Sequence, residues 1–157
     1  MSKIAVVYYS YGNNTKKIAD MIQSKKDVEL FRIEPVTPYT GSYNKVVDEG
    51  KKEIDSGMKR PIQALNIHLD QYDTIIIGTP VWWYTMAPVV STFLAETDLS
   101  GKKIVPFATN AGWLGHTFQD IEKLCPASKV EEGMSIQFSE STLKTSIKAI
   151  ESWIEAI

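Results

Sequence analysis

Cysteine and histidine are scarce in this sequence, which has one cysteine, Cys125, and two histidines, His68 and His116. A lone cysteine cannot form a disulfide within the chain. One thiol and two imidazoles that are distant in sequence also fall short of the ligand set of a zinc site. We therefore exclude a disulfide framework and a metal centre, and we expect Cys125 to be a small buried apolar group.

Long apolar runs and an excess of positive charge are also missing. No stretch approaches the ~20 apolar residues of a membrane-spanning helix. The formal net charge is −2, whereas binding to nucleic acid or an anionic membrane requires a basic surface. The N-terminal segment MSKIAVVYYS also lacks the ordered regions of a signal peptide. We expect a cytoplasmic protein whose partner is neither nucleic acid nor membrane.

Apolar segments with the composition of β-strands recur along the chain. The 157 residues are 43% hydrophobic, enough for one domain, residues 1–157, with a sizeable core. The expected strands are 4–9, 28–33, 73–78, 103–109 and 134–138. The first is continuously apolar, which is typical of a strand covered on both faces, and the last alternates like an edge strand. Within the fourth, Pro106 predicts either a bulge or a nitrogen that faces no acceptor.

Helical spacing of apolar residues fills the intervals between these strands. The first expected helix follows residue 14. The others cover 43–55, 88–96, 117–124 and the segment from about 141 to the C-terminus. The alternation predicts an α/β fold, a three-layer α/β/α sandwich with right-handed crossovers. The connection 34–72 is long for one helix, and either an ordered loop or a flexible flap explains it. Its charge run EGKKE, residues 49–53, indicates a solvated helix face.

The loop SYGNNT, residues 10–15, follows the first strand and begins a helix. Its backbone N–H groups and hydroxyls lie where the helix dipole favours an anion, so a phosphate monoester would fit. The loop has no lysine or arginine, and we expect Lys16 and Lys17 to turn outward. The alternative is a plain helix cap made by Asn13 or Asn14.

Aromatic residues follow the third and fourth strands. The segment TPVWWYTMAP, residues 79–88, has two adjacent tryptophans, whose indole N–H groups need partners. The segment TNAGWLGHT, residues 109–117, adds Trp113 and two glycines that allow close approach to a ligand. Ligands of open parallel sheets bind at the carboxyl ends of strands, so a flat aromatic ligand is expected there. Packing against a neighbouring helix is the alternative for each tryptophan.

Together, YYSYGNNTKKIA, GTPVWWYTMAP and ATNAGWLGHT resemble the flavodoxin-like family, in particular its short members with a TPVWW loop. The resemblance covers the whole chain and implies a five-stranded parallel sheet in the order 2-1-3-4-5 with FMN as cofactor. It implies that the FMN phosphate contacts Ser10, Gly12, Asn13, Asn14 and Thr15. The isoalloxazine ring would lie between Pro80, Val81, Trp82, Trp83 and Tyr84 on one side and Thr109, Asn110, Ala111 and Gly112 on the other.

The function that this resemblance implies is electron transfer between redox proteins, which needs no catalytic acid or base. Two features depart from the family. VWWYTM has no glycine where many flavodoxins flip a peptide, and a net charge of −2 is small for an acidic docking face.

Two alternatives stay open: an FMN-dependent NAD(P)H oxidoreductase acting on quinones or other small acceptors, and a binding module without flavin. We expect redox proteins or a small electron acceptor as partners, and a monomer or weak homodimer. His116 either contacts the flavin or substrate, or faces solvent at a helix start.

Overall fold

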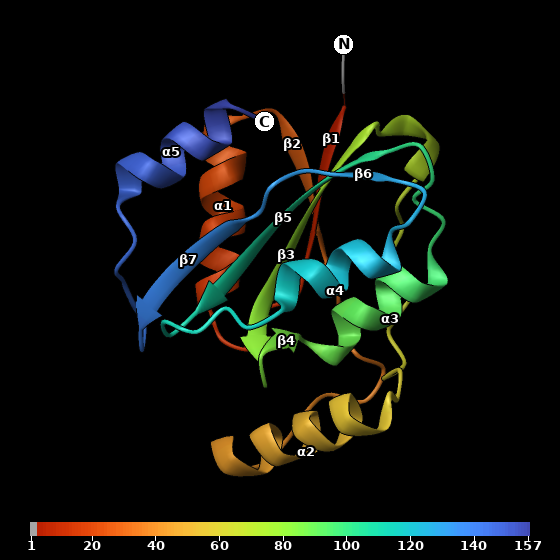
Figure 1. Cartoon of the computed structure of the whole chain (residues 1–157), viewed down its shortest axis with the longest axis vertical. Helices are drawn as coiled ribbons and strands as arrows, with labels where there is room; N and C mark the ends of the chain where they lie inside the picture. The colour runs from red at the N-terminus through yellow and green to blue at the C-terminus, as the bar shows by residue number, and fades with distance from the viewer. Residues whose placement is uncertain (1–2) are drawn as a thin grey trace.

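The main sheet of the computed structural model, which describes residues 3–157, has five long parallel strands. These are β1 (Ile4–Tyr8), β2 (Val28–Arg32), β3 (Thr74–Trp82), β5 (Lys103–Asn110) and β7 (Met134–Ser139). Their spatial order is β2-β1-β3-β5-β7, and each neighbouring pair is parallel (Figure 1). The predicted α/β class and strand order are confirmed.

Three short strands were not predicted: β4 (Thr85–Met86), β6 (Lys129–Val130) and β8 (Thr142–Leu143). β4 folds back antiparallel onto the end of β3, and β8 does the same on β7, whereas β6 runs parallel to the start of β5. Each has only two residues, too few to show a period in sequence. β4 and β8 extend the sheet at the edge where the main strands end.

The helices are α1 (Asn14–Lys25), α2 (Tyr43–Ser56), α3 (Pro88–Glu96), α4 (Thr117–Leu124) and α5 (Ile147–Glu155), with a short 3-10 turn, η1 (Leu69–Gln71). The predicted start of the last helix near residue 141 is wrong. Ser146 caps α5 by accepting from the N–H of Ala149 at 3.3 Å. The preceding residues form the β7–β8 hairpin instead, and Leu143 in β8 packs on the same core as α5, which explains its helix-like spacing.

The core has two halves, one on each face of the sheet. Val6 and Tyr8 of β1 pack with α1 and α5, while Ala5 and Val7 of the same strand pack with α3 and α4. Figure 1 shows these helix pairs on opposite faces. The alternation places buried residues on both faces of β1, as its continuously apolar sequence predicts.

Pro106 lies in β5 opposite Ile77 of β3 without a break in register. The carbonyl of Ile104, two residues earlier, faces away from β3 and accepts from the N–H of Glu131 at 2.8 Å. Pro106 has the same orientation, because alternate residues of a strand point their backbone groups to the same side. Its nitrogen therefore faces the gap between β6 and β7, which confirms the second of the two expectations for this proline.

The connection 34–72 is an ordered loop against the body of the protein. Its two arms form an antiparallel bridge between Pro35 and Ile62, flanked by hydrogen bonds of 3.0 Å from Val36 to Pro61 and 2.8 Å from Gln63 to Glu34. Its helix, α2, lies across the carboxyl edge of the sheet instead of covering a face (Figure 1). None of the helices in residues 3–157 combines the length and apolar character needed to cross a membrane.

Candidate functional site

The first loop presents free backbone donors at the start of α1. Asn13 is the N-cap residue, but its side chain makes no capping hydrogen bond, and the Asn14 side chain donates to the carbonyl of Glu140 at 2.7 Å. Capping by either asparagine is therefore wrong. Ser10 Oγ accepts from the N–H of Lys16 at 3.2 Å, whereas the structure of residues 3–157 records no partner for the N–H groups of residues 12–15.

The hydroxyls of Ser10 and Thr15 in this loop are already bonded within the protein. Ser10 Oγ donates to the carbonyl of Gly12 at 2.7 Å. Thr15 is buried, and its hydroxyl bonds that of Thr109 at 2.7 Å, which ties the first loop to the end of β5. The amides are thus the loop's principal free donors, and a phosphate ester fits them because a helix N-terminus favours an anion.

Arg32 is a cation that contacts the first loop, and it was not predicted from the sequence. Its Nη2 donates to the carbonyl of Ser10 at 2.8 Å. Lys16 instead pairs with Asp20 at 2.8 Å, and Lys17 extends over the Phe138 ring, so both turn away from the loop as expected. The available signal was position, because Arg32 ends β2 beside the end of β1.

The third loop is a tight hairpin turn between β3 and β4. Trp82 pairs with Thr85, and the two turn residues Trp83 and Tyr84 have φ angles of 49° and 68°. Such angles suit glycine or asparagine, and a bulky residue there costs on the order of 1–3 kcal/mol. Strain of this kind is concentrated at functional sites in proteins.

The two adjacent tryptophans have different surroundings. Trp82 makes edge-to-face contacts with Tyr9, Tyr11 and Tyr39, at ring-centroid distances of 5.9, 6.0 and 5.2 Å. Trp83 donates from Nε1 to the carbonyl of Val47 in α2 at 2.8 Å and remains 38% exposed. Packing within the protein therefore accounts for Trp82, whereas Trp83 keeps an accessible face.

The third and fourth loops pack directly on each other. Gly115, at φ +62°, lies so close to the hairpin that a Cβ atom there would be 2.3 Å from the carbonyl oxygen of Tyr84. The N–H of His116 donates to the same oxygen at 2.8 Å. Tyr84 and Trp113 form an edge-to-face pair with centroids 5.8 Å apart, and they are 50% and 67% exposed. An exposed aromatic pair thus joins the two loops.

The predicted site residues all lie at the carboxyl edge of the sheet, but their exposure differs. Ser10, Thr15 and Thr109 are buried; Asn14, Pro80, Val81, Trp82 and Asn110 are half-buried; Gly12, Asn13, Trp83, Tyr84, Ala111 and Gly112 are exposed. Asn110 shapes its own loop by accepting from the N–H of Gly112 at 2.9 Å. Their contacts with a ligand stay a prediction.

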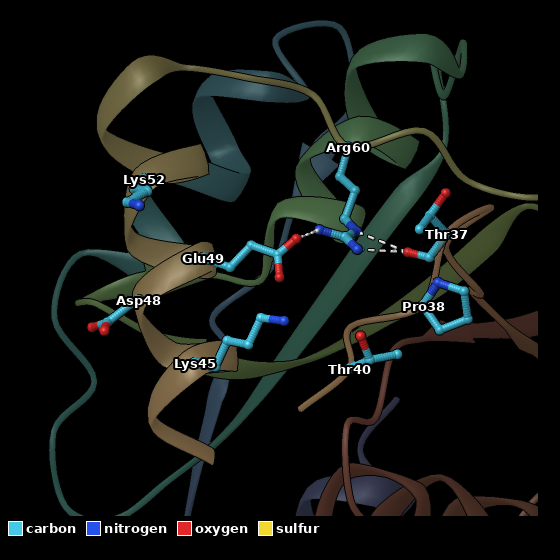
Figure 2. Close-up of a pocket in the computed structure, with 8 residues that line it drawn as sticks. All are labelled: Thr37, Pro38, Thr40, Lys45, Asp48, Glu49, Lys52 and Arg60. Carbon is cyan, nitrogen blue, oxygen red and sulfur yellow. Dashed lines mark hydrogen bonds and ion pairs between the residues drawn. The ribbon is translucent and has the colours of Figure 1, made fainter. Parts of the chain in front are cut away.

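Two hollows are lined by α2 and its neighbours. One, of about 640 Å³, is open and lined by Thr37, Pro38, Thr40, Lys45, Asp48, Glu49, Lys52 and Arg60 (Figure 2). The other, of about 290 Å³, lies between the end of α2, α3 and α4. None of the predicted site residues lines either hollow. The buried cation of the first, Arg60, is already fully paired, so the candidate site remains the edge with free amides and exposed aromatic rings.

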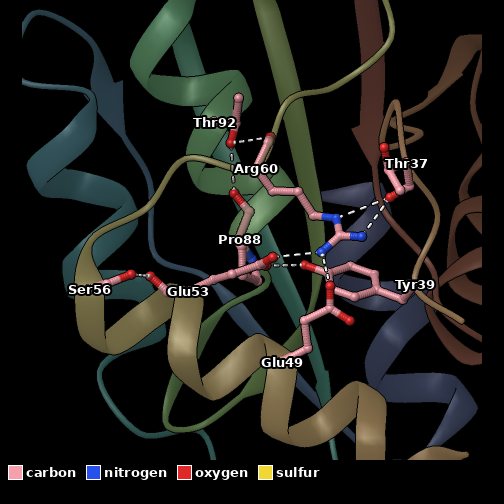
Figure 3. A network of polar contacts seen from close by, with 8 residues as sticks. All are labelled: Thr37, Tyr39, Glu49, Glu53, Ser56, Arg60, Pro88 and Thr92. Atoms are coloured by element: carbon pink, nitrogen blue, oxygen red, sulfur yellow. Dashed lines mark hydrogen bonds and ion pairs between the residues drawn. The ribbon is translucent and has the colours of Figure 1, made fainter. Parts of the chain in front are cut away.

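Arg60 is the centre of a buried polar network that holds α2 in place (Figure 3). It is 6% exposed, pairs through Nη1 with Glu53 at 2.6 Å and Glu49 at 2.8 Å, and donates twice to the carbonyl of Thr37. Its guanidinium lies 3.6 Å from the ring centroid of Tyr39. Glu53, expected on a solvated helix face, is 5% exposed, so that expectation is wrong for this residue.

Tyr39 completes the network by donating its hydroxyl to Glu53 at 2.6 Å. Burial, and then this hydrogen bond, raise the pKa of Tyr39 above its usual range, so the phenol stays neutral. The network was invisible in sequence because it joins a loop, a helix and a second loop. It fixes α2 over the tyrosine and tryptophan cluster beside the third loop.

The fold and the edge residues have the architecture of doubly wound nucleotide-binding proteins. The sequence matches the flavodoxin family, Flavodoxin_4, over residues 3–157, and the chain belongs to this family. The resemblance seen in its motifs is thereby confirmed. No curated protein matches the chain.

Solved structures extend this comparison. A protein from Bacteroides eggerthii is 29% identical, with 100% of this chain and 98% of that chain covered and a TM-score of 0.84. A flavoprotein from Lactobacillus acidophilus, solved in complex with FMN, is 28% identical over 86% of this chain and 93% of that chain, with a TM-score of 0.75. Oxidised flavodoxin 2 from Bacillus cereus, at 21% identity, a TM-score of 0.60 and coverage of 99% and 97%, shares the fold.

Proposed function

We propose that this chain binds FMN at the carboxyl edge of its sheet and transfers electrons between redox proteins. The observation that supports this most directly is that the N–H groups of residues 12–15 have no partner within residues 3–157, while Arg32 bonds the nearby carbonyl of Ser10. A phosphate group would accept from these donors where the helix dipole and the guanidinium both favour negative charge. The FMN bound to the Lactobacillus acidophilus relative supports the choice of cofactor.

The ring end of the proposed site is made by the third and fourth loops. Trp83, Tyr84 and Trp113 offer exposed aromatic surface, and residues 109–112 offer backbone groups. When bound, FMN supplies the redox chemistry, and the protein holds, orients and shields it. The strained turn at residues 83–84 keeps two of these aromatic rings at the edge of the sheet.

A second candidate is an FMN-dependent NAD(P)H oxidoreductase acting on quinones or other small acceptors. The exposed Tyr84–Trp113 pair supports it, since a planar acceptor can contact aromatic surface. The small net charge of −2 supports it also, because docking to a basic redox protein usually relies on an acidic face. A cytoplasmic location and a monomer or weak homodimer are proposed with either function.

The phosphate site is tested by placing a carboxylate at Gly12. A Cβ atom on this glycine would have no other atom within 4 Å, and its φ is not positive, so Gly12→Asp and the uncharged control Gly12→Asn both fit without strain. Charge repulsion of about 1–4 kcal/mol predicts FMN affinity at least about fivefold weaker for Gly12→Asp than for Gly12→Asn. Riboflavin, which has no phosphate, should bind the two variants equally. Equal FMN affinities, measured by flavin fluorescence, would refute this phosphate site.

The two candidate functions are separated by the reaction of the FMN-loaded protein with its donors. An electron carrier, reduced anaerobically, passes electrons to an added cytochrome c and leaves NAD(P)H unconsumed. Fast, saturable NAD(P)H oxidation without a protein partner would instead establish the oxidoreductase. Stopped-flow absorbance of the flavin and of NAD(P)H distinguishes these outcomes.

A further inference from the structure

His116 belongs to a hydrogen-bonded chain that runs from the protein interior to its surface. Its Nδ1 bonds to Oδ2 of Asp120, and the same oxygen accepts from the hydroxyl of Thr85 at 2.6 Å. Thr85 is buried, the Asp120 side chain is 25% exposed, and that of His116 is 59% exposed. The buried threonine thus fixes the carboxylate, and the carboxylate fixes the imidazole.

This arrangement assigns different roles to the two ring nitrogens. A carboxylate bonded to Nδ1 holds the ring orientation and places the proton of the neutral ring on Nδ1. Nε2 is then the atom that can take up a proton and give it to another molecule. The same division of roles is used wherever a histidine oriented by a carboxylate moves protons in catalysis.

The backbone of His116 lies where the third and fourth loops meet. The His116 N–H donates to the carbonyl of Tyr84, and the adjacent Gly115 packs against the Tyr84 backbone. Three residues earlier, Trp113 forms the exposed pair with Tyr84. A planar molecule held on this aromatic pair would therefore lie beside the loop segment that carries His116.

An ordinary ion pair between residues four apart on a helix is the simpler explanation, and this chain offers examples of it. Lys16–Asp20 and Lys51–Asp55 have both partners largely exposed, and among residues 3–157 neither carboxylate has a third partner. Asp120 differs because Thr85, 35 residues away in sequence, also binds it. The other charged groups near Asp120 are Glu53, Lys59 and Lys123, which line the hollow of about 290 Å³ together with Asp120.

We infer that His116 is a catalytic proton donor to a quinone, with Asp120 and Thr85 as its positioning residues. A quinone becomes a hydroquinone by taking up two electrons and two protons, and reduced FMN supplies both electrons and one proton. The second proton leaves Nε2 of the His116 imidazolium, whose N–H bond breaks as an O–H bond forms on the quinone oxygen. The neutral imidazole then regains a proton from water. This inference rests on the FMN binding proposed above, and it deepens the second candidate function by naming a quinone as the acceptor and His116 as its proton donor.

The orientation of His116 is tested without flavin, because the chain has only two histidines. Nitrogen-15 NMR of the neutral rings should show the Nδ1–H tautomer for His116 and not for the exposed His68, which serves as the internal reference. Asp120→Asn should remove this difference and leave the His68 signals unchanged. If the two histidines show the same tautomer in the wild type, the positioning role is refuted.

Proton donation is tested by comparing two oxidants of the photoreduced, FMN-loaded protein. Reduction of menadione, a quinone, consumes protons, whereas reduction of ferricyanide takes up one electron and no proton. His116→Gln should slow reoxidation by menadione about a hundredfold and change the ferricyanide rate by less than about twofold. Asp120→Asn should also slow reoxidation by menadione and not by ferricyanide. Asp55→Asn, a matched change in an exposed ion pair, should change neither reoxidation rate.

The outcomes separate this inference from the proposed function. Equal slowing of both oxidants, or no slowing with menadione, overturns the role of His116 while FMN binding and electron transfer stand. A chain that binds no FMN overturns both together.

Discussion

α2 and α3 both lie near the third loop, but different interactions hold them in place. Six of the nine residues of α3 are buried, and they pack on the sheet with apolar side chains such as Val90 and Phe93. Only three of the fourteen residues of α2 are buried, and one of these is Glu53, paired with Arg60. Apolar burial tolerates changes of pH, whereas a buried ion pair depends on both partners keeping their charges. The sheet and α3 should therefore stay folded under changes that release α2.

The largest effect should follow truncation of the apolar helix. Phe93→Ala leaves a cavity where a 3% exposed ring packs between α3 and the sheet. We expect a loss of about 3–5 kcal/mol in the free energy of unfolding, measured by urea titration with signals from the whole molecule changing together. Glu96→Ala, at an exposed position at the end of the same helix, is the control and should change stability by less than about 0.5 kcal/mol. If Phe93→Ala destabilised α2 alone, the apolar packing of α3 would not be what holds the fold together.

Removing one charge from the Arg60 network should loosen α2 while α3 stays in place. Glu53→Gln preserves shape but leaves the buried Arg60 without its closest carboxylate, at a cost of about 3 kcal/mol. We expect this loss in the local opening of α2 and residues 37–40, measured by amide hydrogen exchange, with β1 and β3 unaffected. Glu49→Gln is the matched control, because its side chain is 40% exposed and its pair is worth less. Equal effects of the two variants would refute the buried network as the anchor.

Alkaline pH should destabilise the folded protein through Tyr39. The pKa of this residue is raised by burial and by its hydrogen bond to Glu53. An unfolded tyrosine loses its proton near pH 10, while the folded Tyr39 keeps its own. The unfolded state then binds fewer protons, so stability falls as pH rises above about 10, by up to about 1.4 kcal/mol per pH unit. Tyr39→Phe should show a shallower fall in urea titrations between about pH 9 and 11. Burial also raises the pKa of Tyr9, which contributes equally in both proteins. Parallel pH profiles would refute the contribution of Tyr39.

Much of the fold could be predicted because its main strands and helices are long enough to show their own periodicity. Helices α3 and α4 begin and end at the predicted residues. The failures are short or depend on distant partners. Leu143 matched a helical face but lies in a strand of two residues, and β4 exists only because β3 continues to Trp82 and turns back.

The candidate site was predictable in position more than in detail. The loops that follow β1, β3 and β5 meet at one edge because parallel strands end on the same side. Their internal contacts were not predictable. Thr15 is predicted to contact a phosphate, and that stays a prediction, but the bond of its hydroxyl to Thr109, 94 residues away in sequence, had no signal in the sequence. Arg32, which approaches the loop at Ser10, had no motif to indicate it.

The sequence by itself determined the order of strands and helices, the amide-rich loop at residues 10–15 and the aromatic residues after the third strand, because these depend on local composition and periodicity. Only the tertiary structure decided which charges are buried and which side chains are oriented. Arg60 meets Glu53 and Thr37, and Asp120 meets Thr85, across loops whose lengths do not specify where their ends pack. The physical reason is that burial and pairing of a polar group depend on neighbours brought together by the whole fold.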